Sequence, residues 1–357
     1  MSLQGLGLRD FRCIQTADLE LHGRCNVISG ENASGKTSLL EAIFYLGRGR
    51  SFRTARSETL IRKGGHELLL TGRVHRAGRS QAVGVRFSRE RFEARAGGER
   101  IASLAELARV LPVQAIDPEV HRLVEEGPQE RRRYLDWGVF HVEPSFVDHW
   151  RRYQRALRQR NAALRAGQGP TVVQAWNPEL VEAGERVAEF RQRYLELLRP
   201  HVAAVGERLL GLPLELGLSR GWAGDATLAD ALEAAWPRDA ERAMTHVGPH
   251  RADLSIRVGG ELARDRISRG QQKLTAASML LGQLRCDAEQ GSAVAALLVD
   301  DPAAELDSAH LEKFLREVLD LPAQLFVTAL DAQNPSIRAL PQGHMFHVEH
   351  GVLTRLL

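Results

Sequence analysis

A chain of 357 residues with 43% hydrophobic side chains can bury a sizeable core, which excludes a disordered or fibrous protein and favours about two domains. The formal net charge of +3 is small, and the first twelve residues contain no apolar leader. The longest apolar run, Ala293 to Val299, is too short to span a bilayer, so we expect a cytoplasmic protein.

The number and spacing of the cysteines argue against proteins stabilised by disulfide bonds or by zinc. Cys13, Cys25 and Cys286 are odd in number and widely spaced, which argues against a disulfide framework or a zinc site. We expect three buried, reduced thiols.

The N-terminal part predicts short strands that lead into a loop and a helix. Strands are expected at Leu3 to Leu8, Ala17 to Leu21 and Cys25 to Ser29, and the helix at Lys36 to about Leu46. Glu67 to His75 and Gln81 to Phe87 then form an expected hairpin, an antiparallel piece attached to this part of the chain.

The middle of the chain, residues 117–242, has a helical pattern. Long helices are expected at Phe146 to Arg165 and Pro178 to Leu210, and Pro200 should kink or split the second one. All five tryptophans lie in this segment, so we interpret it as an inserted domain with its own core.

The α/β pattern returns in residues 243–357. The expected elements are strand Asp253 to Val258, helix Ser268 to about Cys286, buried strand Ala295 to Val299, helix Asp307 to Leu319, and strands Gln324 to Thr328 and His344 to Val348.

The loop after the third strand matches G-x-x-x-x-G-K-[ST]. Glycines let such a backbone curl so that its N–H groups and the helix N-terminus face phosphates. Lys36 should reach the β and γ phosphates of ATP, and Thr37 should bind Mg²⁺. The predicted nucleotide-binding residues here are Gly30, Glu31, Asn32, Ala33, Ser34, Gly35, Lys36, Thr37 and Ser38.

A second candidate site lies where the strand Ala295 to Val299 ends in Asp300 and Asp301. Asp300 would hold Mg²⁺ and Asp301 would orient or deprotonate the attacking water. Taken alone, these could be solvated acids in a turn, but the phosphate loop favours the catalytic interpretation.

A third motif, Ser268-Arg269-Gly270-Gln271, opens a predicted helix about thirty residues before the acidic strand. A serine cap, a glycine and a helix N-terminus form a second anion site. Ser268, Gly270 and Gln271 are therefore nucleotide-binding candidates, and an ordinary capped helix is the alternative.

The order of these motifs resembles ABC-type ATPase heads, and several stretches are similar to the RecF family of bacterial DNA-repair ATPases. These stretches are Leu8 to Arg12, Pro118-Glu119, Glu126 to Trp137, Gly248 to Leu254 and Asp300 to Asp307. The predicted fold class is therefore α/β, an ABC-type head with a phosphate-loop sheet and an antiparallel β piece, plus an inserted, mostly helical arm. The expected division is head 1–116, arm 117–242 and head 243–357.

The resemblance implies further residues and partners. Arg12 would contact nucleotide, and Gln114 would sense the metal in a catalytic role. The protein would dimerise on ATP, bind double-stranded, gapped or junction DNA, work with RecR and RecO, and support loading of RecA on single strands coated with SSB. Transporter ATPases end the strand after the acidic one with a switch histidine, whereas here Thr328 is followed by Ala329 and Leu330. Asp301 also replaces the water-activating glutamate, so we expect slow hydrolysis.

Basic residues gather in two stretches. Residues 48–109 hold fifteen Lys or Arg against six Glu, and residues 131–165 hold nine Arg against three acids. Such an excess suits a DNA-binding face, although a solvated face is the alternative. The DNA-binding candidates are Arg50, Arg53, Arg56, Arg151, Arg155 and Arg158.

Three rival functions stay open: a chromosome-maintenance (SMC-like) head, the ATPase subunit of an ABC transporter, and a non-catalytic DNA scaffold. The short insert disfavours the first rival, and the missing histidine and the basic stretches disfavour the second. His344, His347 and His350 point to different faces of a strand, which disfavours a metal site. His250 is either structural or a nucleotide contact.

Overall fold

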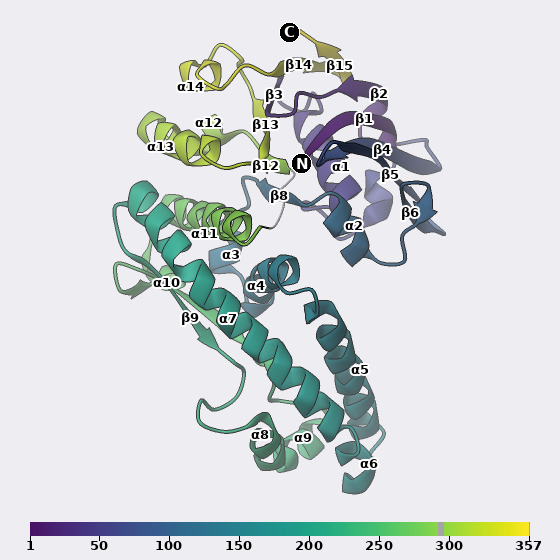
Figure 1. Ribbon diagram of the computed structural model, residues 1–357, viewed down its shortest axis with the longest axis vertical. Helices are drawn as coiled ribbons and strands as arrows, with labels where there is room; N and C mark the ends of the chain where they lie inside the picture. Colours follow the sequence, from purple (N-terminus) through teal and green to yellow (C-terminus); the bar gives the residue numbers. More distant parts are fainter. Residues whose placement is uncertain (292–295, 357) are drawn as a thin grey trace. The chain divides into compact units, whose positions relative to one another are not determined.

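The computed structural model describes residues 1–291 and 296–356 and divides into two compact units (Figure 1). Unit 1 contains Met1–Val120 with Gly291–Leu357, and unit 2 contains His121–Gln290. The first boundary lies close to the predicted 116/117. The second differs from the predicted 242/243, because residues 243–290 belong with the helical unit.

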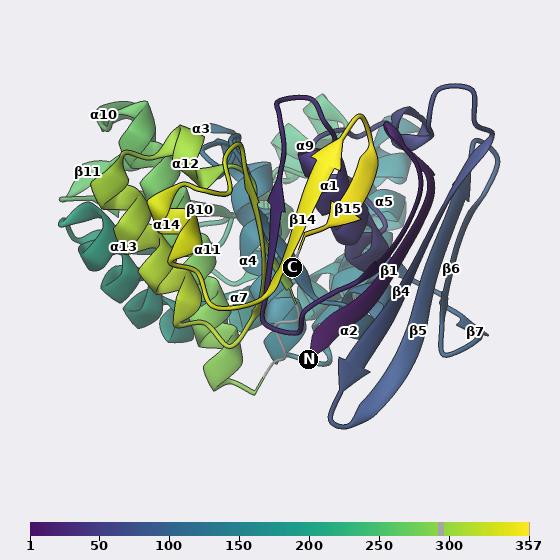
Figure 2. The ribbon, with the colours of Figure 1, turned by 90° about the horizontal axis from the view of Figure 1, so that it is seen from above.

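The α/β unit is built on two six-stranded sheets. One is antiparallel, in the order β2-β1-β4-β5-β6-β7, and Figure 2 shows its long strands running side by side. The other has the order β15-β14-β3-β13-β12-β8, and β14, β3, β13, β12 and β8 run parallel. The bounds are β1 Ser2–Phe11, β2 Ile14–Glu20, β3 Cys25–Ser29, β4 Glu67–Arg76, β5 Arg79–Ser88, β6 Phe92–Ala96, β7 Glu99–Arg100, β8 Val113–Ile116, β12 Ala296–Val299, β13 Gln324–Ala329, β14 His344–Glu349 and β15 Val352–Arg355.

A helix fills the core of this unit. Helix α1, Lys36–Arg48, is buried along almost its whole length and packs against strands of both sheets. The remaining helices are η1 Ser57–Leu60, α2 Leu104–Val110, α12 Pro302–Glu305, α13 Ser308–Leu319 and α14 Pro335–Arg338. The predicted strands and the hairpin are confirmed within a few residues; Ala295, included in the predicted acidic strand, lies outside the described residues.

Unit 2 is mostly helical, with one small antiparallel sheet in the order β11-β10-β9. Its helices are α3 Arg122–Glu125, α4 Pro128–Val142, α5 Phe146–Arg165, α6 Pro170–Gln174, α7 Asn177–Leu210, α8 Leu228–Ala234, α9 Trp236–Arg242, η2 Pro249–Arg251, α10 Ala263–Arg266 and α11 Arg269–Glu289. Its strands are β9 Leu214–Ser219, β10 Asp253–Val258 and β11 Glu261–Leu262.

Helix α11 is held in unit 2 by close packing on α7. A Cβ atom at Gly282 would lie 2.8 Å from the Cα of Val202, so glycine permits the two helices to approach. Tyr134 of α4 donates a hydrogen bond to the carbonyl of Met279, and its own carbonyl accepts one from Gln283. These contacts explain why the unit boundary falls after α11.

Pro200 does not split its helix, so one of the two predicted effects, a split, is wrong. Helix α7 continues from Asn177 to Leu210 with Pro200 inside it. A proline removes one backbone hydrogen bond, at a cost of about 3 kcal/mol. Burial of apolar side chains on both sides of it, such as Leu198 and Val202, offsets that cost.

A buried carboxyl group near the end of α11 makes the stability of unit 2 depend on pH. Asp287 accepts a 2.7 Å hydrogen bond from the hydroxyl of Tyr194, and burial raises the pKa of Asp287 to about 7. The folded state therefore holds a proton that the unfolded state releases near pH 4. The protonated carboxyl of Asp287 therefore contributes its full stabilisation of the folded state below about pH 4. This contribution is lost as the pH rises through 7.

We predict that Asp287→Asn, which imitates the protonated carboxyl, raises the free energy of unfolding at pH 8 by up to about 4 kcal/mol, while the gain shrinks as the pH falls toward 4. Urea unfolding at pH 5 and pH 8 measures this difference. Asp225→Asn, on the exposed surface of the same unit, is the control and should change neither value. An equal effect of Asp287→Asn at both pH values would contradict the buried titration.

Candidate nucleotide-binding site

The phosphate loop connects the fully buried strand β3 to helix α1. Gly35 at the start of α1 has φ 122°, a conformation that favours glycine, and it has no side chain to cap the helix. A Cβ atom at Gly30 would lie 2.3 Å from the carbonyl oxygen of Val348 in β14, so glycine is required there too. The N–H groups at the start of α1 are therefore available to an anion.

Lys36 is the first residue of α1 and is buried, with 7% of its surface exposed. Its ammonium group donates hydrogen bonds to the carbonyl oxygens of Gly30 (2.7 Å) and Glu31 (2.8 Å). The loop thus holds one cation directly over the curled backbone, where it can interact with phosphate oxygens.

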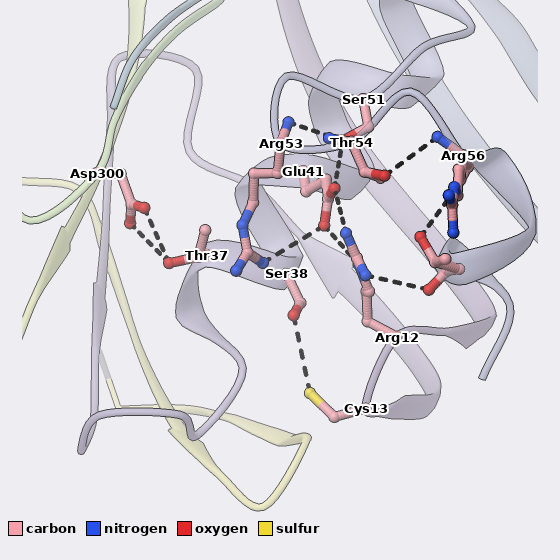
Figure 3. Close-up of polar contacts among 11 residues, drawn as sticks. Arg12, Cys13, Thr37, Ser38, Glu41, Ser51, Arg53, Thr54, Arg56 and Asp300 are labelled. Atoms are coloured by element: carbon pink, nitrogen blue, oxygen red, sulfur yellow. Dashed lines mark hydrogen bonds and ion pairs between the residues drawn. The ribbon is translucent and has the colours of Figure 1, made fainter. Parts of the chain in front are cut away.

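Thr37 meets the acidic strand, although the two are far apart in the sequence. The hydroxyl of Thr37 lies 3.0 Å and 2.9 Å from the two carboxylate oxygens of Asp300 (Figure 3). A hydroxyl and a carboxylate are hard oxygen ligands of the kind that Mg²⁺ prefers, beside phosphate oxygens. The residues present therefore fit a magnesium ion.

Asp301 follows directly and is the N-cap residue of α12, with φ 45° in the left-handed region. Burial raises the pKa of its carboxyl group, Lys36 opposes the shift, and Asp300 and Glu305 add to it. A carboxylate with a raised pKa is a better proton acceptor, which suits a group that activates water.

These residues line one cavity of about 730 Å³ within unit 1. Its volume suits a nucleotide-sized ligand. The lining residues are Arg12, Cys13, Asn32, Ala33, Gly35, Lys36, Thr37, Ser38, Arg53, Thr59, Ile61, Lys63, Pro118, Asp300 and Asp301.

A buried carboxylate that the sequence analysis missed organises one wall of the cavity. Glu41 of α1 is fully buried and accepts two 2.8 Å hydrogen bonds from the guanidinium of Arg12 (Figure 3). It also accepts a hydrogen bond from Ser51 and lies 3.7 Å from Arg53. In the sequence, Glu41 could have been singled out because it is the one acidic residue in the otherwise apolar run Leu39 to Phe44.

Two predicted residues, Arg53 and Gln114, lie at positions that differ from those expected for their predicted roles. Arg53, a DNA-binding candidate, lines the cavity beside Glu41. Gln114, the candidate metal sensor, is buried in the middle of β8, where its side-chain oxygen lies 2.5 Å from a guanidinium nitrogen of Arg48. It is not among the described residues that line the cavity.

The cysteines and the remaining basic candidates near the cavity show further differences. Cys25 and Cys286 are buried as expected, whereas Cys13 is exposed and lines the cavity. Its sulfur is 3.9 Å from the hydroxyl of Ser38. Arg50 and Arg56 are exposed in the loop that follows α1.

The motif at the start of α11 forms a capping box in unit 2. The hydroxyl of Ser268 accepts a hydrogen bond from the N–H of Gln271 (3.3 Å), and the side chain of Gln271 accepts one from the N–H of Ser268 (3.0 Å). The space beside Gly270 is open, since a Cβ atom there would have no neighbour within 4 Å among the described residues. The packing of unit 2 therefore does not require glycine at this position.

His250 has a structural role. One ring nitrogen lies 2.5 Å from the hydroxyl of Tyr153 and the other 3.1 Å from the carbonyl oxygen of Thr245. Burial lowers the pKa of His250 to about 4, so the ring is neutral at pH 7. In residues 1–291 and 296–356 no group of three or more His, Cys, Asp or Glu could hold a metal ion, and this includes the His344 group.

Helix α5 presents a row of arginines to solvent. Arg151, Arg155 and Arg158 are exposed, while Tyr153, Leu157 and others on the opposite side are buried. Arg151 lies 4.0 Å from the carboxylate of the exposed Asp148, whereas Arg152 forms closer pairs, at 2.7 Å and 2.9 Å, with Glu179 and Glu182 of α7. The predicted helical spacing of the three candidates is confirmed.

The chain has known relatives over its full length. A family model described as the RecF/RecN/SMC N terminal domain matches residues 2–352. The chain is 39% identical to the DNA replication and repair protein RecF of Shewanella oneidensis strain MR-1 and 40% identical to that of Shewanella sp. strain W3-18-1, with 99% of each chain covered.

Solved structures give the same result. The recombination mediator protein RecF with ATP, from the RecFOR pathway, matches with a TM-score of 0.90 at 26% identity, covering 100% of this chain and 98% of that one. An Smc head bound to the C-winged helix domain of ScpA matches with a TM-score of 0.61 at 15% identity over 100% and 98% of the two chains. The second likeness concerns the fold alone. In the described part of the chain, no helix is both long enough and apolar enough to cross a membrane.

Proposed function

Because this chain belongs to the RecF/RecN/SMC family and, within it, to the RecF proteins, we propose that it is an ATP-dependent DNA-binding protein of recombinational repair. The observation that carries the proposal is the meeting of Thr37 and Asp300 at one cavity, beside Lys36. These groups are of the kinds that bind phosphate and Mg²⁺ in phosphate-loop ATPases, which supports MgATP as the ligand.

In the proposed reaction the loop N–H groups and Lys36 bind the phosphates, and Thr37 and Asp300 hold Mg²⁺. The ion, when bound, neutralises phosphate charge in the transition state. Asp301 orients the attacking water and accepts its proton. Asp has a shorter side chain than Glu, so turnover is slow, and ATP acts as a timed clamp.

ATP binding is proposed to bring two copies together. The start of α11, with Ser268 and Gln271, would contact the γ-phosphate held by the partner copy. The open space at Gly270 supports this role, since the chain's own packing does not require a glycine there. RecR with RecO, and indirectly RecA on strands coated with SSB, are the proposed partners at gaps and junctions.

Static light scattering with and without ATP, on gapped and duplex DNA, tests this function together with phosphate release. Conversion from monomer to dimer on ATP, with turnover stimulated by DNA, is the expected result. A protein that binds ATP and DNA but stays monomeric would contradict the clamp, and absence of turnover would favour the scaffold.

The exposed arginines of α5 are proposed to contact DNA phosphates. Neutralising Arg151, Arg155 and Arg158 together should weaken duplex binding regardless of sequence and reduce the slope of log affinity against log salt by about three. ATP affinity should not change, because none of the three arginines is among the described residues that line the cavity. Fluorescence anisotropy over a salt series measures the slope.

The control for this prediction is Arg152→Gln on the same helix. Arg152 is held by Glu179 and Glu182, so its loss should leave the slope unchanged. If the triple variant keeps the wild-type slope, this face of α5 is only solvated and the DNA site lies elsewhere.

A further inference from the structure

Near its end, the strand next to the acidic strand carries a threonine, Thr328, that contacts both aspartates. Strands β12 and β13 run parallel, and Val299 pairs with Val327. Their next residues, Asp300 and Thr328, therefore lie beside each other at the carboxyl ends of the strands. The side chain of Thr328 is fully buried.

The hydroxyl of Thr328 makes two hydrogen bonds with defined directions. It accepts one from the backbone N–H of Asp301 at 2.8 Å and lies 2.7 Å from one carboxylate oxygen of Asp300. A hydroxyl has one proton, and a carboxylate can only accept, so Thr328 donates that proton to Asp300. Its lone pair is then free for the N–H of Asp301.

Each of these bonds acts on a group that needs a fixed position. The carboxylate of Asp300 also receives the hydroxyl of Thr37, so two threonine hydroxyls, one of them from Thr328, restrain its position. The backbone of Asp301 has φ 45°, which is costly for a residue other than glycine and persists only when its surroundings hold it. The bond to Thr328 supplies one such restraint.

We propose that Thr328 is a positioning residue for the Mg²⁺ and water sites, because one hydroxyl sets the carboxylate of Asp300 and the backbone from which the side chain of Asp301 projects. This inference rests on the proposed ATPase function. Thr328 is not among the described residues that line the cavity, so it acts through the two aspartates and not on the nucleotide.

The test compares Thr328→Val, which keeps the shape and removes both hydrogen bonds, with Thr328→Ser, which keeps the hydroxyl. Calorimetric titrations of ATP at increasing Mg²⁺ concentrations are the first readout. In Thr328→Val the Mg²⁺ concentration for half-maximal strengthening of ATP binding should rise about tenfold or more. Affinity for ATP without Mg²⁺ should not change, and Thr328→Ser should be close to the wild type.

Steady-state hydrolysis is the second readout, and kcat should fall roughly ten- to a hundredfold in Thr328→Val with little change in KM. Thr245→Val is the matched control. Thr245 is a buried threonine of unit 2 that also accepts one hydrogen bond, from Arg160, and donates one, to Asn161. Its loss should lower thermal stability without moving the Mg²⁺ dependence.

The outcomes separate this inference from the proposed function. A wild-type Mg²⁺ dependence in Thr328→Val overturns the inference, whether or not hydrolysis changes. If the wild type itself binds MgATP and does not hydrolyse it, the enzymatic proposal fails, and the Mg²⁺ titration alone decides the role of Thr328. Should Thr328→Val not fold, Thr328→Cys, with a weak donor of similar size, must show the shift for the inference to stand.

Discussion

Lys36→Met should lose stable ATP binding, with affinity falling by at least about a hundredfold. The ammonium group is the one charge that the phosphate loop holds over its own carbonyl oxygens, at 2.7 Å and 2.8 Å. Methionine keeps the length of the side chain but has neither the charge nor the donors. Isothermal calorimetry with MgATP measures the loss.

Lys313→Met is the control for this variant. Lys313 is an exposed residue of α13 outside the cavity lining, so its replacement should leave ATP affinity unchanged. Circular dichroism should show that both variants fold as the wild type does. An unchanged affinity in folded Lys36→Met would mean that residues 30–37 are not the phosphate site.

The nucleotide site could be predicted from the sequence where it depends on local structure. The strand, glycine loop and helix around Lys36 are contiguous in the chain, and hydrophobic pattern and glycine positions determine them. The approach of Thr37 to Asp300 was expected only because both motifs imply ligands of one Mg²⁺ ion, since the two residues are far apart in the chain. Parallel pairing of β3 with β13 and of β13 with β12 produces that approach, by placing their carboxyl ends at one edge.

The position of Gln114 shows a limit of prediction by motif order. Functional groups of parallel sheets gather beyond the carboxyl ends of the strands. Gln114 precedes the end of β8 by two residues, whereas Pro118, which lines the cavity, follows that end. Counting from the end of the strand would have excluded Gln114 as a pocket residue.

Glu41 and Arg53 could not be assigned to the cavity wall from the sequence because their meeting depends on the path of a loop. After α1 ends, residues 49–56 turn back so that Ser51 and Arg53 reach the side chain of Glu41 (Figure 3). Counting charges grouped Arg53 with its basic neighbours, because the sequence does not show that residues 49–56 turn back towards Glu41. The second boundary of the compact units, after α11, differs from the predicted 242/243 for a related reason, since the packing of α11 on α7 is a tertiary property.

Asp301→Asn should retain ATP binding and reduce hydrolysis by roughly two orders of magnitude or more. The amide cannot accept a proton from water. The side chains of Lys36, Thr37 and Asp300, which are proposed to bind phosphate and Mg²⁺, are unchanged. Phosphate release measured beside calorimetric affinity distinguishes the two steps, and Asp331→Asn, at an exposed site outside the cavity lining, should change neither.

The same variant separates the binding of ATP from its hydrolysis in the proposed clamp. If ATP binding closes the dimer and hydrolysis opens it, a protein that binds but cannot hydrolyse must accumulate as a dimer. Light scattering of Asp301→Asn with ATP should therefore show a dimer that outlasts the wild-type one, and release from DNA should slow in proportion. A monomer with ATP bound would mean that nucleotide binding does not drive dimerisation. Normal hydrolysis by a correctly folded Asp301→Asn variant would mean that Asp301 has no catalytic role.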